Sequence, residues 1–270
     1  MRGDAAGRAE AAFTNTLPSA IRGRSRGRAA WKPLLAAAFW LALLLLAVYR
    51  FDLLEAPLVR AFGSKQALRE RAPLWESMLQ HVSLVLRSTS LSAALGLLLG
   101  MAVRLRAFAE FRAPLLGAAT FLQTVPSAAI LALSVPVLGY GQTPVLIALV
   151  FYGLLPVLRN TARGLDSVPR DALDAAAGMG MTPMQALLRV RWPLALPAVI
   201  SGIRTSAIIN ISAATLGATV GAGGLGVLIV NGIRAMDPVM IIKGALPVSL
   251  LALLASSLFT ALERAQAWRG

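Results

Sequence analysis

Side chains that could carry out chemistry are scarce in this sequence. Its 270 residues include a single histidine, His81, and no cysteine. Without cysteine there is no disulfide framework and no thiolate metal site. One histidine cannot form a histidine-rich metal site, and nothing near it has the spacing of a serine nucleophile elbow. We therefore predict that the chain is not an enzyme and holds no metal or cofactor of its own.

A glycine-rich motif, GAGGLG at 221–226, matches the G-x-G-x-x-G pattern of dinucleotide-binding proteins. That pattern binds a pyrophosphate only where a strand precedes it, a helix follows it and an acidic residue comes about twenty residues later. Here the preceding residues form a predicted membrane span, so we reject a dinucleotide site. The glycines instead favour close packing or a bent, re-entrant turn.

The most informative stretch is DAAAGMGMTPMQALLRVRWP, residues 174–193, a polar interruption between two long apolar segments. Residues 169–177 can form a short helix in which Asp171 and Asp174 lie one turn apart. Carboxylates suit the N-terminal half of a helix, where free backbone N–H groups and the helix dipole favour negative charge. Three small residues, Ala175 to Ala177, would let another surface approach this helix closely.

The second part of this stretch predicts a turn and another helix. Gly178 and Gly180 supply the backbone freedom that the turn requires. Thr182 and Gln185 have the spacing of a capping box. Trp192 is expected to end the helix, because the residue before a proline disfavours the helical region. The candidate site in this helix–turn–helix consists of Asp174, Ala175, Ala176, Gly178, Gly180, Met181, Thr182 and Pro193.

The composition points to a membrane protein. Apolar residues make up 57% of the chain and charged residues only 14%, which is typical of a polytopic membrane protein rather than a soluble domain. The net charge of +14 raises the possibility of nucleic-acid binding. We reject it because the charges sit at the ends of apolar runs rather than on one basic face.

Six apolar segments predict the membrane spans, each of which needs about 17–25 helical residues, and the first is the shortest. They are 34–48, 82–103, 114–138, 142–158, 194–220 and 239–262. The first could be a signal peptide, but no convincing small-x-small cleavage site follows it. We therefore predict that it is an uncleaved membrane helix.

The predicted fold is an all-α membrane protein with six transmembrane helices and a cytoplasmic helix–turn–helix. It divides into a disordered basic tail, a first span with an external segment that holds a short amphipathic helix, a transmembrane core and a short C-terminal tail. These parts are 1–33, 34–81, 82–262 and 263–270.

The distribution of lysine and arginine predicts the orientation. Seven of them lie in the N-terminal tail and five arginines lie in 159–191, whereas the turn at 139–142 has none. Because positively charged loops stay in the cytoplasm, we expect both termini and the 174–193 stretch to be cytoplasmic. The five in 50–81, which four acidic residues offset, are the one exception.

Several polar residues lie within the predicted spans. Arg204 is about ten residues inside the fifth span, and an ionisable residue at this depth is a candidate functional residue. It could equally extend toward the cytoplasm or pair with polar groups of the bundle. The others could line a pathway or simply bond between helices. The set of candidate pathway or gate residues is Gln123, Thr124, Pro126, Ser127, Arg204 and Asn210.

The 174–193 stretch resembles the cytoplasmic coupling loop of type I ABC-importer permeases, which in that family seats in a groove of the ATPase. That loop reads Glu-Ala-Ala, three residues, Gly, nine residues, then Ile-x-Leu-Pro. Here Asp174-Ala175-Ala176 precedes Gly180, and Val190-Arg191-Trp192-Pro193 follows at the matching distance. The chain departs from the family in having aspartate at 174 and tryptophan at 192. A shorter carboxylate reaches less far, which changes the contact that residue 174 can make.

The resemblance covers roughly 75–262 and is strongest over 121–233. The motifs QTVPS, LLPVLRNT, LPAVISGIRT and GAGGLG look most like the glycine betaine/choline/carnitine osmoprotectant branch. The resemblance implies a permease of the inner membrane that forms a homodimer or a heterodimer with a homologue. It also implies two cytoplasmic ATPases, which bind and hydrolyse ATP-Mg, and an external substrate-binding protein.

Other functions remain open from the sequence. Within the same class, the substrate could be another small solute such as an amino acid. The aromatic residues at membrane depth are too scattered to indicate a cage for a quaternary ammonium group. Outside the class, the chain could be a membrane scaffold without transport activity, although the loop motif argues against this. A membrane enzyme is the least favoured alternative.

Overall fold

The computed structural model describes residues 31–63, 73–103 and 110–266, and its regular elements are all helical. The predicted disordered tail, up to residue 30, and the last residues of the predicted C-terminal tail lie outside these ranges. The helices in chain order are α2 (Lys32–Tyr49), α3 (Asp52–Phe62), α4 (Leu74–Ala102), α5 (Arg112–Thr124), α6 (Ser127–Leu138), α7 (Gln142–Asp166), α8 (Arg170–Gly178), α9 (Pro183–Ala186), the π-helix η3 (Leu187–Arg191), α10 (Trp192–Ala213), the 3₁₀-helix η4 (Ala214–Val220), α11 (Gly226–Ala235) and α12 (Pro238–Gln266).

Five helical stretches among the described residues are long and apolar enough to cross a membrane, which confirms the membrane prediction. They are Lys32–Tyr49, Leu74–Ala102, Gln142–Asp166, Pro183–Val220 and Pro238–Gln266. Their bounds differ from the predicted spans mainly at the ends. The second begins at Leu74 rather than at 82, and the last continues through Glu263 into the predicted C-terminal tail.

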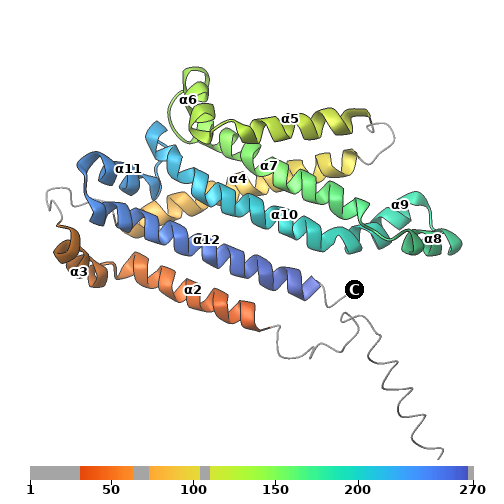
Figure 1. Ribbon diagram of the computed structural model, residues 1–270, viewed down its shortest axis with the longest axis horizontal. Helices are drawn as coiled ribbons and strands as arrows, with labels where there is room; N and C mark the ends of the chain where they lie inside the picture. The colour runs from red at the N-terminus through yellow and green to blue at the C-terminus, as the bar shows by residue number, and fades with distance from the viewer. Residues whose placement is uncertain (1–30, 64–72, 104–109, 267–270) are drawn as a thin grey trace, which may run out of the picture.

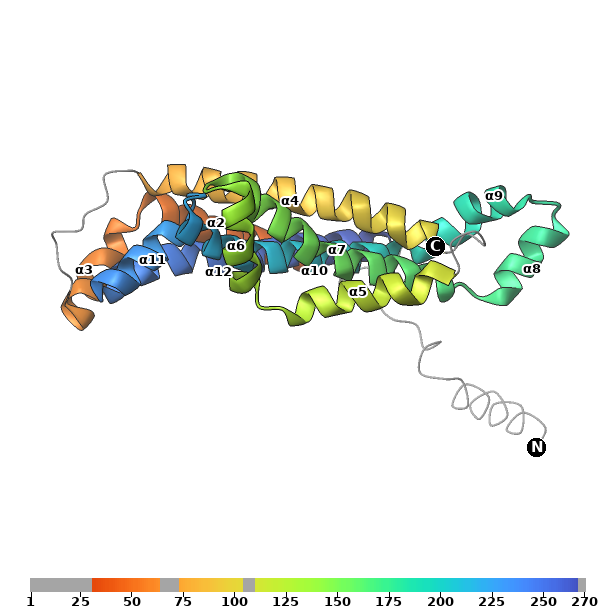
Figure 2. The same ribbon diagram turned by 90° about the horizontal axis from the view of Figure 1, so that it is seen from above.

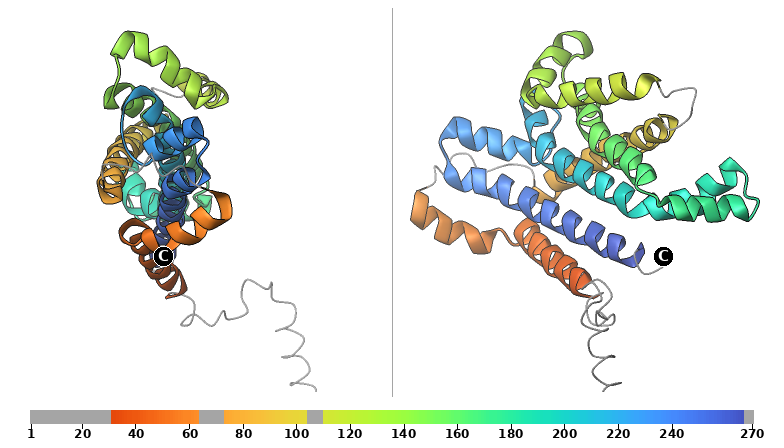
Figure 3. Two further views of the ribbon diagram at one scale, coloured as in Figure 1. Left: turned by 90° about the vertical axis from the view of Figure 1, so that its left-hand side faces the viewer. Right: turned by 45° about the vertical axis from the view of Figure 1, so that its right-hand side comes forward.

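The centre of the bundle is formed by α4, α7 and α10, which pack along much of their length (Figures 1 and 2). Helix α12 packs on α10, and α2 packs on the other side of α12 (Figure 3). The buried side chains Leu155, Val157 and Leu158 belong to α7 and are at most 1% exposed. Helix α7 is therefore the core helix around which the others are arranged.

Glycines bring the central helices close together and show their directions. A Cβ on Gly96 would lie 2.6 Å from that of Val157, and one on Gly100 would lie 2.7 Å from that of Thr161. The residue numbers in the two contact pairs increase together along α4 and α7, so these helices run parallel. The chain between them must return to the end of the bundle where α4 began.

The prediction of one continuous helix for the third span is wrong. Residues 114–138 form two helices, α5 and α6, rather than one, and each is shorter than a membrane span. Pro126 explains the break, because it disfavours the helical region for Val125, whose ψ is 127°. Figure 1 shows α5 lying along α7, with α6 turned near the end where α7 begins.

The glycine-rich motif forms a tight bend, as predicted, and no strand precedes it. It follows η4, and Gly221, Gly223 and Gly224 all have positive φ, which favours glycine. A Cβ on Gly226 would collide with the backbone of Thr215. The segment 214–226 therefore folds back on itself at the end of α10.

Candidate functional site

The predicted helix–turn–helix lies at one end of the molecule. Helices α8 and α9 project beyond the ends of α4, α7 and α12, opposite α3 and α11 (Figures 1 and 2). We call residues 170–186, which comprise α8, the turn and α9, the hairpin. It contacts the rest of the chain mainly through the π-helix η3, which joins it to α10.

The turn after α8 is a Schellman motif centred on Gly180. The N–H of Met181 donates to the carbonyl of Ala176 at 3.1 Å, and the N–H of Gly180 donates to that of Ala177 at 2.9 Å. Gly180 has a φ of +74°, which a residue with a Cβ adopts at a cost. Gly178, in contrast, is the last helical residue and has no positive φ. Only one of the two predicted turn glycines is therefore required by the backbone.

The second helix of the hairpin begins with the predicted capping box. The side chain of Thr182 accepts a hydrogen bond from the Gln185 N–H at 3.3 Å, and the Gln185 side chain accepts one from the Thr182 N–H at 2.9 Å. Pro183 occupies the first helical turn, where no N–H is needed. The two caps fix how the chain leaves α8 and enters α9.

The prediction that Trp192 and Pro193 end the second helix is wrong. Trp192 is helical and Pro193 lies in the first turn of α10, so the helix continues into the membrane. The π-helix explains this, because its hydrogen bonds span five residues and the Trp192 N–H donates to the carbonyl of Leu187. The wider turn rearranges the backbone just before Pro193, which has no N–H to donate.

The hairpin presents a mixed surface. Asp174 and Ala175 are exposed, and Met181 is half-buried. Ala176 is fully buried, so its side chain packs rather than faces outward. Thr182 is exposed although its side chain serves as the cap. Asp174 and Ala175 therefore belong to the surface that another molecule could reach, together with 177–180 and 182–185.

Three exposed apolar side chains of this region were not singled out from the sequence. Met179, Met184 and Leu188 are 69%, 60% and 60% exposed. Exposed apolar side chains that gather in one region often mark a binding surface, and methionine adapts well to a partner. Met179 and Met184 stand out in the sequence as methionines at and just after the turn, whereas no sequence pattern marks Leu188.

Four of the candidate pathway residues gather at the break between α5 and α6. Gln123 donates to the backbone carbonyl of Tyr152 in α7 at 3.3 Å. Thr124 donates to the carbonyl of Phe121 at 2.7 Å, within its own helix. The Tyr152 hydroxyl donates to the carbonyl of Val125 at the break. Pro126 is exposed and Ser127 is half-buried at the start of α6, so these residues form one group on the surface of α7.

The other two candidates, Arg204 and Asn210, lie on α10 and bind neighbouring helices. The Arg204 guanidinium donates to the Ser256 hydroxyl at 2.7 Å and lies 3.6 Å from the Glu263 carboxylate, both on α12. Asn210 is fully buried and donates to Thr89 of α4 at 3.1 Å. Arg204 therefore pairs with polar groups of the bundle, which was one of the interpretations of its position.

Asn210 belongs to a buried polar cluster where α4, α7 and α10 meet. A Cβ on Gly153 would lie 2.5 Å from the hydroxyls of Ser92 and Ser206 and 2.9 Å from the Asn210 side-chain nitrogen. Ser92 donates to the carbonyl of Val150 at 3.0 Å. Gly153 leaves the space into which these polar side chains point. The cluster holds the three central helices together.

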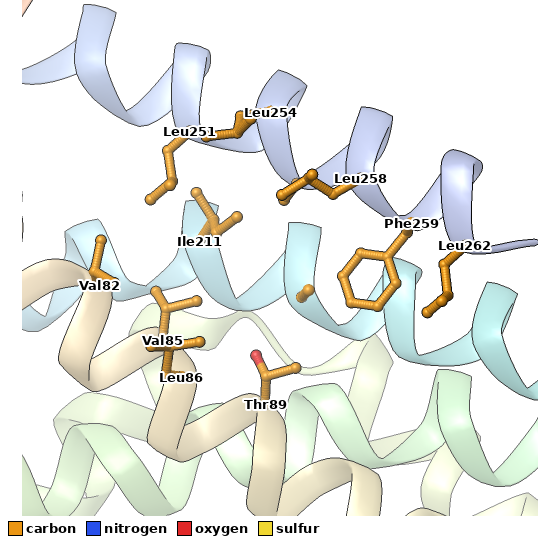
Figure 4. Close-up of a pocket in the computed structure, with 12 residues that line it drawn as sticks. Val82, Val85, Leu86, Thr89, Ile211, Leu251, Leu254, Leu258, Phe259 and Leu262 are labelled. Carbon is orange, nitrogen blue, oxygen red and sulfur yellow. The ribbon is translucent and has the colours of Figure 1, made fainter. Parts of the chain in front are cut away.

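An apolar cavity of about 410 Å³ lies between α4, α10 and α12 (Figure 4). Its lining is apolar except for Thr89, with α12 contributing the largest share. The labelled lining residues are Val82, Val85, Leu86, Thr89, Ile211, Leu251, Leu254, Leu258, Phe259 and Leu262. A space without polar partners suits neither an ion nor a charged solute. The candidate pathway residues at the α5–α6 break do not line it.

No group of three or more histidine, cysteine, aspartate or glutamate residues that could hold a metal ion occurs within the described ranges.

The sequence matches a family of known proteins. Residues 92–268 match the family described as "Binding-protein-dependent transport system inner membrane component". This range includes the hairpin, both candidate groups of polar residues and the glycine-rich segment.

Individual relatives agree with this match. The choline transport system permease protein OpuBB of Bacillus subtilis is 39% identical over 185 residues, which cover 68% of this chain and 84% of that protein. The osmoprotectant import permease protein OsmW of Salmonella typhimurium is 43% identical over 180 residues, or 64% of this chain and 82% of that protein. Among solved structures, an inward-facing MetNI methionine ABC transporter is similar in fold, with a TM-score of 0.63 at 19% identity. The match covers 70% of this chain and 93% of the chain compared.

Proposed function

The chain belongs to the family of binding-protein-dependent transport system inner membrane components, and from this membership we propose that it is the permease subunit of an ATP-driven importer for quaternary-amine osmoprotectants. The observation that carries the substrate class is the similarity to permeases named for choline and for osmoprotectants. A relative from Bacillus subtilis is named for glycine betaine, carnitine and choline together. We propose the same three solutes for this chain.

The hairpin is proposed to bind the ATPase. An element that transmits motion between subunits has to be rigid, and the turn is fixed by a Schellman motif at one end and a capping box at the other. The exposed Asp174 carboxylate can pair with a basic group, and Ala175 beside it lets a partner approach closely. Met179, Met184 and Leu188 add apolar surface. Such a surface, a charge beside exposed apolar side chains, fits a groove on a second protein.

The helix that follows gives this binding site a direct connection to the membrane. From Pro183 to Val220 the chain is helical without interruption, through α9, η3, α10 and η4. A shift of the hairpin would therefore move α10, which packs against α4, α7 and α12. We propose that ATP binding by the ATPase changes the bundle through this route and so alternates the access of the pathway.

The partners follow from the same proposal. A second permease subunit, identical or homologous, would complete the pathway, and two cytoplasmic ATPase subunits would bind one hairpin each. The nucleotide, as its magnesium complex, would be held by the ATPases. A substrate-binding protein would deliver the solute at the opposite end, where α3 and α11 lie.

The orientation is proposed from charge. The arginine-rich 159–191 stretch contains the hairpin, so the hairpin is placed in the cytoplasm. The parallel course of α4 and α7 supports a return crossing by the α5–α6 pair; with that crossing the chain would cross the membrane six times and both termini would be cytoplasmic. An impermeant thiol reagent outside sealed cells should label Tyr140→Cys and not Ser167→Cys; both residues are exposed. The opposite labelling would invert the orientation.

Within the bundle, the four polar residues at the α5–α6 break are the proposed pathway or gate. Gln123, Thr124, Pro126 and Ser127 lie where two short helices replace a continuous one, and such breaks in membrane proteins are tolerated where they line a cavity. Arg204 and Asn210, because they bind α12 and α4, are proposed to keep α10 in place beside the pathway.

Reconstituted transport tests the proposal. With its ATPase and binding protein in liposomes, the complex should take up betaine, choline or carnitine only with ATP inside and binding protein outside. The control is an excess of an amino acid that lacks a quaternary nitrogen, which should not compete. Uptake confined to such amino acids would assign the chain to another branch of the family, and no ATP-dependent uptake of any solute would refute the importer.

A further inference from the structure

The glycine-rich segment, which comprises η4 and the glycine-rich motif (214–226), lies where five helices meet. Its 3₁₀ part, η4, packs against α4, α6, α7, α10 and α11. The hairpin lies at the other end of α10 (Figure 1). Any motion that separates the ends of these helices must therefore displace this segment.

Two consecutive residues of α4 bind the segment and the end of α10 just before it. His81, which is 1% exposed, has its Nε2 3.1 Å from the carbonyl oxygen of Ile211, near the end of α10. The Gln80 Oε1 accepts a hydrogen bond from the Gly224 N–H at 3.0 Å. A Cβ on Gly224 would lie 3.3 Å from the histidine ring, so this glycine permits the close approach.

A second set of contacts holds the same segment from the start of α7. The Gly141 N–H donates to the carbonyl of Val220 at 2.8 Å, and the Gln142 side chain donates to that of Ala222 at 3.4 Å. Arg87 of α4 donates to the Gln142 Oε1 at 3.0 Å and joins the two sides. The segment is thus bound by hydrogen bonds from α4 and from the start of α7.

We propose that Gln80 and His81 are positioning residues of a clasp that keeps this end of the bundle closed, and that the clasp opens when the importer opens toward its binding protein. This inference rests on the proposed function. The clasp consists of few hydrogen bonds, each of which shifts an equilibrium by only about two- to tenfold. Val220, Ala222 and Leu225 of the segment also pack in the apolar core, so opening the clasp must separate these apolar contacts as well.

The absence of native cysteine allows the clasp to be probed directly. Val220 is 7% exposed, so Val220→Cys should react slowly with an impermeant thiol reagent while the clasp is closed. Adding Gln80→Met keeps the side-chain length and removes the acceptor, and should raise the labelling rate about two- to tenfold. Gln80→Glu keeps an acceptor oxygen and should restore slow labelling. Leu79→Ala, at an exposed neighbour, is the matched control and should leave the rate unchanged.

The opening step is tested in the assembled complex with native Gln80. Addition of ATP and binding protein should raise the labelling of Val220→Cys severalfold over the nucleotide-free complex. An unchanged rate would overturn the opening step. In the first experiment, equal labelling with Gln80→Met and native Gln80, or fast labelling with Gln80→Glu, would overturn the clasp. The first experiment needs no substrate, so its failure is distinct from a failure of betaine or choline uptake.

Discussion

At the scale of single residues, the hairpin contains two glycines with different requirements. Gly178 ends α8 with ordinary helical geometry, whereas Gly180 has a φ of +74°, and a Cβ at either position would meet no other atom within 4 Å. Space is therefore not what distinguishes them. The difference is the backbone conformation alone, which makes the pair a matched test of the turn.

We predict that Gly180→Ala destabilises the hairpin and Gly178→Ala does not. The left-handed conformation costs a residue with a Cβ about 1–2 kcal/mol. This corresponds to a roughly 5- to 30-fold increase in the fraction of molecules whose hairpin is locally unfolded. Trypsin cleavage after Arg170 and Arg189, in vesicles that expose the hairpin, should accelerate by that factor for Gly180→Ala only. Equal cleavage of the two variants would mean that the turn is not maintained in solution.

Arg204 supplies the second prediction at this scale. Arg204→Met leaves Glu263 partly buried without its partner, and removing one member of a fully buried pair costs about 3–5 kcal/mol. Because both side chains are still a quarter to a third exposed, we expect about 1–3 kcal/mol. The double variant Arg204→Met/Glu263→Leu should recover most of this loss. Thermal unfolding in detergent measures both, and a double variant as unstable as the single one would contradict the pairing.

What the sequence could predict at the residue scale depended on distance along the chain. The capping box of Thr182 and the turn at Gly180 involve neighbouring residues, so spacing alone predicted them. The partner of Arg204 could not be found in this way. Glu263 lies on another span, and only the packing of α12 against α10 brings the two together.

At the scale of the elements, two prolines had opposite effects although both follow a residue that they should force out of the helical region. Pro126 breaks the third predicted span into α5 and α6. Pro193 is absorbed by the π-helix, and α10 continues. The sequence pattern before a proline does not distinguish these outcomes, because the hydrogen bonds of the surrounding turn and its tertiary contacts decide them.

The contact between α7 and α10 gives the prediction at this scale. A Cβ on Gly202 would lie 2.8 Å from that of Asn160 and 2.9 Å from the carbonyl oxygen of Pro156. Gly202→Ala should therefore push the helices apart and cost about 1–3 kcal/mol, as overpacking does. Gly117→Ala in α5, where a Cβ meets nothing within 4 Å, is the matched control and should show no loss. If thermal unfolding gives the two variants the same stability, this packing is contradicted.

At the scale of the whole molecule, membrane class and family could be predicted from composition and one loop motif, and the comparisons confirm both. The arrangement of the helices could not. The parallel course of α4 and α7 and the close packing of α7 on α10 depend on glycine contacts between distant segments, and the return through α5 and α6 follows from the parallel course. Such contacts leave no periodic signal in a single sequence.

The central claim is that the hairpin binds the ATPase, and co-purification of the ATPase with hairpin variants tests it most directly. Ala175→Trp places a large side chain on the exposed contact surface, whereas Leu53→Trp changes an exposed position of α3 at the opposite end of the molecule. We predict that Ala175→Trp inserts normally but loses the ATPase and substrate-stimulated hydrolysis, while Leu53→Trp retains both. Retention of both by Ala175→Trp, at wild-type levels, would show that the hairpin is not where the ATPase binds.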